Sequence, residues 1–390
     1  MKKILFVTNK LITGGIETAL LETIKLIKSP DVDITVLTIH EGGELVDKFK
    51  EICTVNHIPQ QQVKQAFLYR SYLIEQLRKF RIFSFITKTV RKLINKFIRS
   101  FYTKKSYIAK RLSFDNVEYD IAVSYFTPYS VIVPLVTECI KAKQKIAYIH
   151  QDVYHDARKK NASTFSACYQ KFNKIVCVSE AVKTSFINYH PNLANKVSVI
   201  YNPIDVDKIL QLSQQGTPLL GDEKDIQICS VGRLSEAKNF ELAINSCKIL
   251  VDKGYHIKWY VCGDGSLRNS LETNVKTKKL ERSFVFLGNQ NNPYPYICAS
   301  QIYVQTSRIE SYCITLAEAR ALKKPIVTTN FPCASEHIIH KHNGFICEMT
   351  PESIADSIEK LILSPELREK FSNNTTPIDS DYTKLTQLFE

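Results

Sequence analysis

The chain has 390 residues, of which 44% are hydrophobic and 23% are charged. This length predicts two domains or slightly more, and the composition excludes disordered and fibrous proteins. The net charge of +13 comes from one segment, because residues 64–111 hold fourteen lysines and arginines but a single acid, Glu75. The rest of the chain is therefore electrically neutral.

The N-terminus and the cysteines indicate a cytoplasmic protein. Met1-Lys2-Lys3 precedes an apolar run that ends at Thr8, which is too short for a signal peptide. No stretch approaches the roughly 18 apolar residues of a membrane-spanning helix. The eleven cysteines are scattered without any Cys-x2-Cys or Cys/His cluster. We therefore expect reduced thiols, no export and no bound metal.

Short runs rich in Val and Ile recur along most of the chain and predict strands buried on both faces. These runs lie at 4–8, 34–39, 121–125, 146–150, 175–179, 197–201, 226–231, 257–262, 284–287, 302–306, 326–329 and 345–347. Helical patterns separate them, such as Ile16, Leu20, Ile24 and Ile27. The alternation predicts an α/β fold of parallel sheets covered by helices.

The apolar rhythm pauses at 211–225, where Ser, Gln, Gly, Pro and charged residues predominate. This composition predicts a linker at 206–225 between two Rossmann-like domains, 1–205 and 226–375. Residues 376–390 are predicted as a terminal helix that returns to the first domain. A ligand is expected in the cleft between the domains, at the carboxyl ends of their strands.

A second interruption, at 60–115, has Phe and Leu at helical spacings with Arg and Lys between them. We interpret it as a basic amphipathic insertion in the first domain. Such a helix fits an anionic membrane surface, where each cation contributes about 1 kcal/mol. The alternative is that its apolar face packs on its own domain. Nucleic acid would also attract the charge, but the wide, bulky apolar face favours lipid, so residues 64–111 predict peripheral membrane association.

The strongest candidate site follows the run at 302–306. Glu310 and Glu318 are eight residues apart, about 12 Å along a helix, so they cannot share one proton or metal. They could instead bind two ends of a sugar–diphosphate–ribose ligand. The backbone N–H groups of Ser311, Tyr312, Cys313 and Ile314, at the predicted helix start, would face the phosphates. Taken singly, Glu310 could be a helix cap and Glu318 part of a solvated helix face.

Two further clusters follow predicted strands. Gly232-Arg233 and Lys238 lie after the run at 226–231, where two cations could bind a diphosphate and stabilise it as a leaving group. The alternative is that both cations form surface salt bridges. Gly14 and Gly15 lie after the run at 4–8 and would let the backbone approach a phosphate or sugar. This glycine pair is not part of a dinucleotide or ATP motif.

Together these motifs resemble the retaining family-4 glycosyltransferases of the GT-B fold. The family's Glu-x7-Glu motif matches Glu310 and Glu318, and its donor-binding Gly-Arg-Lys set matches Gly232, Arg233 and Lys238. Further matches, in the family's order, are Gly14-Gly15, Val199–Asp205, Cys262–Gly265, Phe286–Gly288, Glu336–Ile338 and Asn343–Phe345. The resemblance covers 1–60 and 120–390 and is strongest from 196 to 348.

The resemblance implies roles for individual residues. Arg233 and Lys238 would bind the donor diphosphate, Glu310 the transferred sugar and Glu318 the ribose. His150 would contact the donor sugar or the acceptor, although a structural histidine is an equal alternative, and Asp152 is a weaker candidate. The family retains anomeric configuration without a metal or a covalent intermediate, so no cofactor is expected. The triplets Asp31-Val-Asp33 and Asp205-Val-Asp207 are rejected as metal motifs.

We therefore predict a retaining hexosyltransferase that uses a nucleotide sugar, with UDP favoured over GDP. The acceptor would be a lipid-linked or growing glycan in cell-surface polysaccharide or glycoconjugate synthesis. The alternatives are an enzyme like the UDP-sugar 2-epimerases, or an inactive homologue that serves as a membrane or partner scaffold. Homo- or hetero-oligomers are compatible with the sequence, and nucleic acid is not an expected partner.

Overall fold

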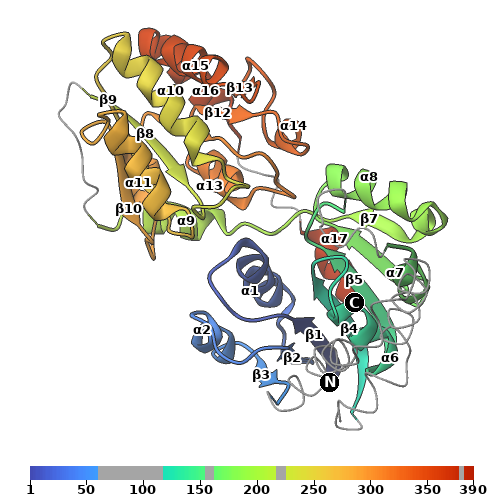
Figure 1. The fold of residues 1–390 in the computed structure, drawn as a ribbon. Coiled ribbons are helices and arrows are strands. Elements are labelled where there is room, and N and C mark those ends of the chain that lie inside the picture. The colour runs from blue at the N-terminus through green and yellow to red at the C-terminus, as the bar shows by residue number, and fades with distance from the viewer. Residues whose placement is uncertain (60–116, 154–161, 217–224, 377–381) are drawn as a thin grey trace, which may run out of the picture. The chain divides into compact units, whose positions relative to one another are not determined.

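The computed structural model describes residues 1–59, 117–153, 162–216, 225–376 and 382–390, which form two compact α/β units (Figure 1). The first unit comprises Met1–Tyr201 with Tyr382–Glu390, and the second comprises Asn202–Asp381. Each unit has its own parallel sheet. The predicted insertion at 60–115, including the basic span 64–111, lies outside the described residues.

The first unit is built on a seven-stranded parallel sheet with the order β3-β2-β1-β4-β5-β6-β7. The apolar runs lie in register, since Ile4 of β1 pairs with Ile34 of β2 and Ile121 of β4. Burial on both faces explains why these strands are continuous in Val and Ile. The strands are β1 (Lys2–Thr8), β2 (Val32–Thr38), β3 (Thr54–His57), β4 (Glu118–Phe126), β5 (Lys141–Ile149), β6 (Lys174–Cys177) and β7 (Val197–Val199).

The edge strand β3 was not among the predicted strands. Its sequence, Thr-Val-Asn-His, holds one aliphatic residue, and its side chains are exposed or half-buried. An edge strand needs little apolar surface, so it gives no apolar run to detect.

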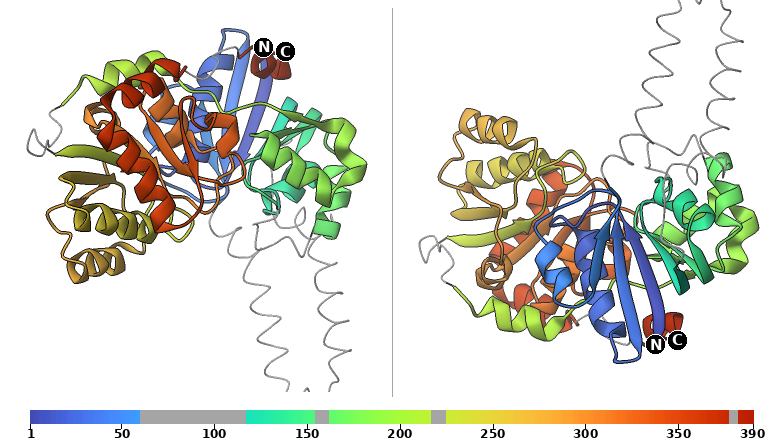
Figure 2. Two further views of the ribbon diagram at one scale, coloured as in Figure 1. Left: turned by 90° about the horizontal axis from the view of Figure 1, so that it is seen from above. Right: turned by 90° about the horizontal axis from the view of Figure 1, so that it is seen from below.

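Helices of the first unit cover its sheet and bring the chain ends together. The termini lie side by side (Figure 2), and α17 packs on the sheet, where the rings of Phe389 and Phe6 lie 5.5 Å apart. The helices are α1 (Gly15–Ile27), α2 (Val46–Lys50), α6 (Ile132–Glu138), α7 (Ala162–Tyr169), α8 (Glu180–Tyr189), the 3₁₀ helix η3 (Pro191–Lys196) and α17 (Thr383–Phe389).

The second unit contains a six-stranded parallel sheet with the order β10-β9-β8-β11-β12-β13. Its core is centred on Trp259, the single tryptophan of the chain, which is fully buried and donates to the Ser230 hydroxyl at 2.9 Å. The strands are β8 (Ile226–Val231), β9 (Ile257–Cys262), β10 (Phe284–Gly288), β11 (Ile302–Gln305), β12 (Ile326–Thr329) and β13 (Gly344–Cys347).

Two layers of helices accompany this sheet. Helices α10 and α15 pack side by side (Figure 1), whereas α9 packs with α12 and α13. The helices are α9 (Val206–Ser213), α10 (Phe240–Asp252), α11 (Arg268–Thr277), α12 (Tyr294–Ala299), α13 (Ile314–Ala321), α14 (Ala334–His337), α15 (Pro351–Leu363) and α16 (Pro365–Asn374).

The predicted linker at 206–225 is wrong in its first part, because Val206–Ser213 forms α9 of the second unit. The Asp205 carboxylate caps this helix by accepting from the Lys208 N–H at 3.0 Å, and Ile209 is buried. The helix also packs against α12 and α13, so tertiary packing and the cap stabilise it although polar residues follow it in the sequence. Residues 217–224 lie outside the described ranges.

Within the described ranges, every helix is too short or too polar to cross a lipid bilayer.

Candidate functional site

Two loops of the second unit lie where the strand order of its sheet reverses. Strands β8 and β11 are direct neighbours, but the chain continues from β8 to β9 on one side and from β11 to β12 on the other. Ligands of open parallel sheets bind at the carboxyl ends of strands at such a point. The loop at 232–239 follows β8, and the loop at 306–313 follows β11.

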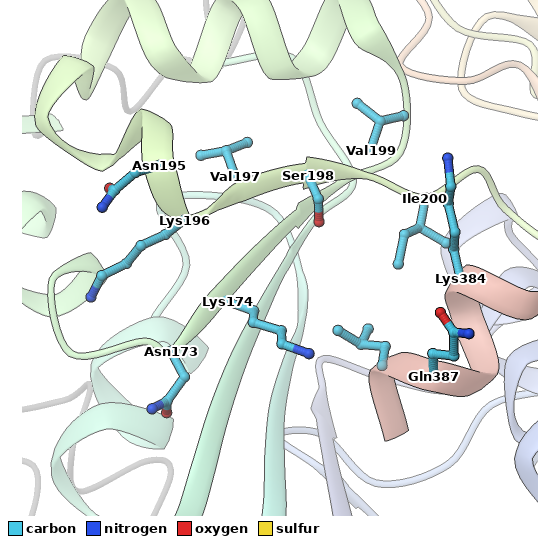
Figure 3. A pocket seen from close by; sticks show the side chains of 11 residues that line it. Asn173, Lys174, Asn195, Lys196, Val197, Ser198, Val199, Ile200, Lys384 and Gln387 are labelled. Atoms are coloured by element: carbon cyan, nitrogen blue, oxygen red, sulfur yellow. The ribbon is translucent and has the colours of Figure 1, made fainter. Parts of the chain in front are cut away.

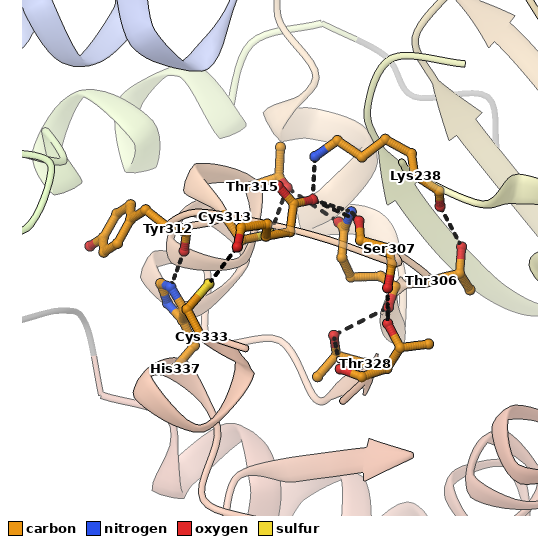
Figure 4. Close-up of polar contacts among 12 residues, drawn as sticks. Lys238, Thr306, Ser307, Tyr312, Cys313, Thr315, Thr328, Cys333 and His337 are labelled. Atoms are coloured by element: carbon orange, nitrogen blue, oxygen red, sulfur yellow. Dashed lines mark hydrogen bonds and ion pairs between the residues drawn. The ribbon is translucent and has the colours of Figure 1, made fainter. Parts of the chain in front are cut away.

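Besides the ion pair described below, three hydrogen bonds join these loops. The Arg308 N–H donates to the Ala237 carbonyl at 2.8 Å, and the Arg308 guanidinium donates to Asn239 Oδ1 at 3.0 Å. The Thr306 hydroxyl donates to the Lys238 carbonyl at 3.1 Å (Figure 4). Two motifs about 70 residues apart in the sequence are thereby held together.

Lys238 and Glu310 form an ion pair between these loops, which the dashed line from the labelled Lys238 amine marks in Figure 4. Their side chains are 19% and 12% exposed, so water screens the pair poorly. Burial is the largest single influence and opposes the charge of Lys238, but Glu310 together with the neighbouring Cys313 and Cys333 raises the lysine pKa above its ordinary value. The predicted alternatives, a helix cap for Glu310 and a surface salt bridge for Lys238, are therefore wrong.

Arg233 is exposed and has no hydrogen bond or ion pair within the described ranges, so its charge is available to a ligand. Just before Arg233, the backbone of Gly232 lies very close to the backbone of Gly263. Gly263 has φ +148°, and a Cβ there would lie 2.0 Å from the Gly232 carbonyl oxygen. Only glycine permits this close approach of two backbones.

The helix after Glu310 begins later than predicted. Of the four residues expected to present N–H groups at its start, only Ile314 is helical, and Cys313 is the N-cap residue with φ 64°. The Leu316 N–H bonds the Cys313 carbonyl at 3.0 Å, whereas those of Ile314 and Thr315 have no partner among the described residues. Free N–H groups at a helix start favour an anion. Ser311 and Tyr312 lie in the preceding bend.

Glu318, in the second turn of α13, is 8% exposed, so the predicted solvated helix face is wrong. Burial raises the pKa of its carboxyl to about 7, against the opposing effects of the Tyr294 hydroxyl and the Lys238 charge. The Tyr294 hydroxyl donates to Glu318 Oε1 at 2.9 Å. Since residues 310–313 are not helical, the separation of 12 Å predicted from helix geometry does not apply to these two glutamates.

His150 follows β5 in the first unit and is 7% exposed. Its ring lies 4.2 Å from that of Tyr125 and 5.7 Å from that of Tyr148. Burial lowers the His150 pKa to about 3, so the imidazole is neutral, and Nε2 has no partner among the described residues. Asp152 accepts a hydrogen bond from the Ser185 hydroxyl.

The predicted glycines also lie in the first unit, after β1. Gly14 is the N-cap residue of α1, where its extended backbone accepts from the Thr18 N–H at 3.0 Å, and Gly15 is the first helical residue. The structure thus places the glycine pair at a helix start, as the sequence predicted.

Two open pockets lie elsewhere and are not lined by the site residues described above. One, of about 370 Å³, lies in the first unit between β6, β7 and α17 and is lined by Lys174, Lys384 and several amides (Figure 3). The other, of about 320 Å³, lies in the second unit beside the loop at 289–292. Among the described residues, His, Cys, Asp and Glu side chains form no cluster that could hold a metal.

Sequence analysis missed three residues that bond the predicted carboxylates: Tyr294, Gln305 and Ser307. Tyr294 reaches Glu318 from the start of α12, and Gln305 reaches Glu310 from the last position of β11. Gln305 could have been noticed in the sequence, because it is a polar residue at the end of a buried strand and directly precedes the predicted site. Tyr294 gave no signal of its own.

Residues 217–376 match the sequence model of the family described as glycosyl transferases group 1. The capsular polysaccharide biosynthesis glycosyltransferase CapM of Staphylococcus aureus is 30% identical over 210 residues, which are 51% of this chain and 55% of CapM. An N-acetylgalactosamine-N,N'-diacetylbacillosaminyl-diphospho-undecaprenol 4-alpha-N-acetylgalactosaminyltransferase of Campylobacter jejuni is 26% identical over 216 residues, 55% of this chain and 57% of that protein. The chain thus spans a little over half the length of these relatives.

A comparison with solved structures also finds a match. The crystal structure of Anabaena HepE in complex with UDP and glucose matches with a TM-score of 0.74 and 18% identity, covering 100% of this chain and 98% of HepE. At this identity the match shows a shared fold.

Proposed function

We propose that this protein is a retaining hexosyltransferase, because residues 217–376 match the sequence model of glycosyl transferases group 1 and the chain shares its fold with HepE. It would move a hexose from a UDP-sugar to a lipid-linked or growing glycan acceptor in the synthesis of a cell-surface polysaccharide or glycoconjugate. The observation that carries the proposal is the Lys238–Glu310 pair beside the free N–H groups of α13.

These groups suit the parts of a nucleotide sugar. Arg233, Lys238 and the N–H groups of Ile314 and Thr315 would meet the diphosphate, since cations and a helix start both favour an anion. Glu310 would accept hydrogen bonds from hydroxyls of the transferred sugar. Glu318 would bind the ribose hydroxyls, and a carboxyl with a pKa of about 7 can donate as well as accept near neutral pH.

The proposed reaction follows from the family resemblance. The bond between the anomeric carbon and the diphosphate oxygen breaks while the acceptor oxygen bonds that carbon on the same face, so configuration is retained. The leaving phosphate takes the proton of the acceptor hydroxyl. Arg233 and Lys238 would stabilise the charge that develops on the departing diphosphate.

Substrate classes are inferred from the relatives. CapM is named for capsular polysaccharide biosynthesis, the Campylobacter relative is named for a diphospho-undecaprenol acceptor, and HepE was solved with UDP and glucose. These names support a surface glycan, a lipid-linked acceptor and UDP respectively. His150, Gly14 and Gly15 of the first unit would contact the acceptor or the donor sugar.

We further propose that residues 64–111 hold the protein on the inner face of the cell membrane. Their fourteen cations and single acid suit anionic headgroups, and a lipid-linked acceptor would lie at the same surface.

Calorimetric titration with UDP, GDP and ADP tests the proposed donor. We expect the wild type to bind UDP and Arg233→Ala to bind it about 1.5–3 kcal/mol more weakly, the contribution of a hydrogen bond to a charged group. Arg282→Ala is the matched control, because Arg282 is an exposed arginine just before β10, at the amino ends of the strands. Failure of the wild type to bind any nucleotide, or equal affinity in wild type and Arg233→Ala, would count against the proposal.

A further inference from the structure

Gln305, the last residue of β11, is 2% exposed, and its side-chain amide makes four hydrogen bonds. Its oxygen accepts from the Tyr303 hydroxyl at 2.9 Å and from the Thr315 hydroxyl at 3.2 Å. Its nitrogen donates to the Ser307 hydroxyl oxygen at 2.7 Å and to Glu310 Oε1 at 3.4 Å. These contacts use the full bonding capacity of a primary amide, two donors and two lone pairs.

The carboxylate of Glu310 decides which way this amide points. An ionised carboxylate can only accept hydrogen bonds, so the NH₂ group, rather than the carbonyl oxygen, must face Glu310. The hydroxyl of Tyr303, which is itself fully buried, then donates to the amide oxygen on the opposite side. The orientation of Gln305 is therefore fixed by partners on both sides.

Gln305 is one of three groups that bond the same oxygen of Glu310. Lys238 Nζ donates to Oε1, the Ser307 hydroxyl donates to it at 2.6 Å, and the Gln305 amide lies at 3.4 Å. In the described part of the chain no group bonds Oε2. One oxygen is saturated by the protein, and the other remains able to accept from a ligand.

Gln305 also connects this carboxylate to α13. Thr315, which donates to the Gln305 oxygen, stands in the first turn of the helix whose free N–H groups would meet the diphosphate. The start of α13 is itself held by backbone hydrogen bonds from Leu316 and Ala317 to the Cys313 carbonyl, so the helix supports Gln305 rather than depending on it. Rigid support of this kind fixes a ligand-binding group before the ligand arrives.

We propose that Gln305 is a positioning residue for sugar recognition, which holds the Glu310 carboxylate so that Oε2 accepts a hydroxyl of the transferred sugar. This inference rests on the proposed function. Gln305 itself does not reach the ligand, and its effect passes through Glu310. Loss of the amide should therefore weaken recognition of the sugar much more than recognition of the nucleotide.

The test compares binding of UDP with binding of UDP-glucose, UDP-galactose, UDP-N-acetylglucosamine and UDP-N-acetylgalactosamine. Gln305→Met keeps the length of the side chain but removes all four of its side-chain hydrogen bonds. Its control is Gln227→Met, because Gln227 is also buried, near the start of β8, and its side chain makes none of these contacts. Calorimetry gives the dissociation constants of UDP and of the UDP-hexose that binds the wild type.

We expect Gln305→Met to raise the dissociation constant of the UDP-hexose about tenfold and that of UDP less than twofold, as expected for hydrogen bonds to a charged group. Hydrolysis of the UDP-hexose by water should slow in parallel. The ratio of the UDP-hexose dissociation constant to the UDP dissociation constant should therefore rise. Tyr303→Phe removes one partner of the amide and keeps the ring, so it should raise this ratio by a smaller factor. Gln227→Met should leave the ratio unchanged.

Two outcomes would overturn the inference. One is wild-type affinity for both UDP and the UDP-hexose in Gln305→Met and in Tyr303→Phe, and the other is an equal loss of both affinities, which would indicate a purely structural role. Should Gln305→Met fail to fold, Tyr303→Phe decides between these results. A wild type that binds neither UDP nor any of the UDP-hexoses would refute the proposed function itself, so the two failures are distinguishable.

Discussion

The ion pair between Lys238 and Glu310 gives the sharpest quantitative test of the site. Two unit charges 4 Å apart attract by roughly 4 kcal/mol at an effective dielectric constant of 20, before desolvation is subtracted. Removing one partner of a buried pair typically costs roughly 3–5 kcal/mol, because the other charge stays buried. Here the side chains keep 19% and 12% exposure, and Glu310 retains the Ser307 hydroxyl, so the cost should be smaller.

We expect Lys238→Met and Glu310→Gln each to lower the free energy of unfolding by about 2–3 kcal/mol, and the double variant to lose about 1.5–2 kcal/mol less than the sum. The assay is urea unfolding followed by tryptophan fluorescence. Trp259 is the single tryptophan of the chain and is fully buried in the second unit, so its emission reports unfolding of the unit that holds the pair. A coupling energy within about 0.5 kcal/mol of zero would refute the reasoning.

The same fluorescence assay serves two further predictions, and a lipid assay serves a third. The pKa of Glu318 is about 7 when folded and 4.5 ordinarily, so its protonated form adds stability that is complete below pH 4.5 and is lost as pH rises to 7. Between pH 4.5 and pH 7 the free energy of unfolding should fall by about 3 kcal/mol because of Glu318, and Glu318→Gln should abolish this fall. The same pH dependence in the variant would contradict the shifted pKa. Gly263→Ala should destabilise the second unit by about 2 kcal/mol or more, because its Cβ would meet the Gly232 carbonyl, whereas a loss below about 0.5 kcal/mol would mean that the loop adapts. Neutralising part of 64–111 should release the protein from anionic liposomes without changing UDP affinity, and equal liposome binding would remove the membrane proposal. The residues to replace with glutamine are Arg91, Lys92, Lys96 and Arg99.

Much of the fold follows from local patterns in the sequence. Buried parallel strands require continuous aliphatic runs, and runs such as those at 4–8 and 257–262 coincide with β1 and β9. The edge strand β3 was missed because it holds one aliphatic residue, and helix α9 was missed because it is short and runs into the polar stretch at 211–225. Short elements of this kind depend on the neighbours that the folded chain supplies.

The residue types of the site were also evident from the sequence, because Arg233, Lys238, Glu310 and Glu318 follow strand ends in a recognisable order. Only the tertiary structure decided how these groups are paired. Burial raises the pKa of Glu318, and the Lys238–Glu310 pair forms because β8 and β11 are neighbours in the sheet although about 70 residues separate their loops. The amide of Gln305 acquires its partners in the same way. Spacing along the chain determines which groups a loop presents, whereas the strand order determines which loops meet and which charges lose their water.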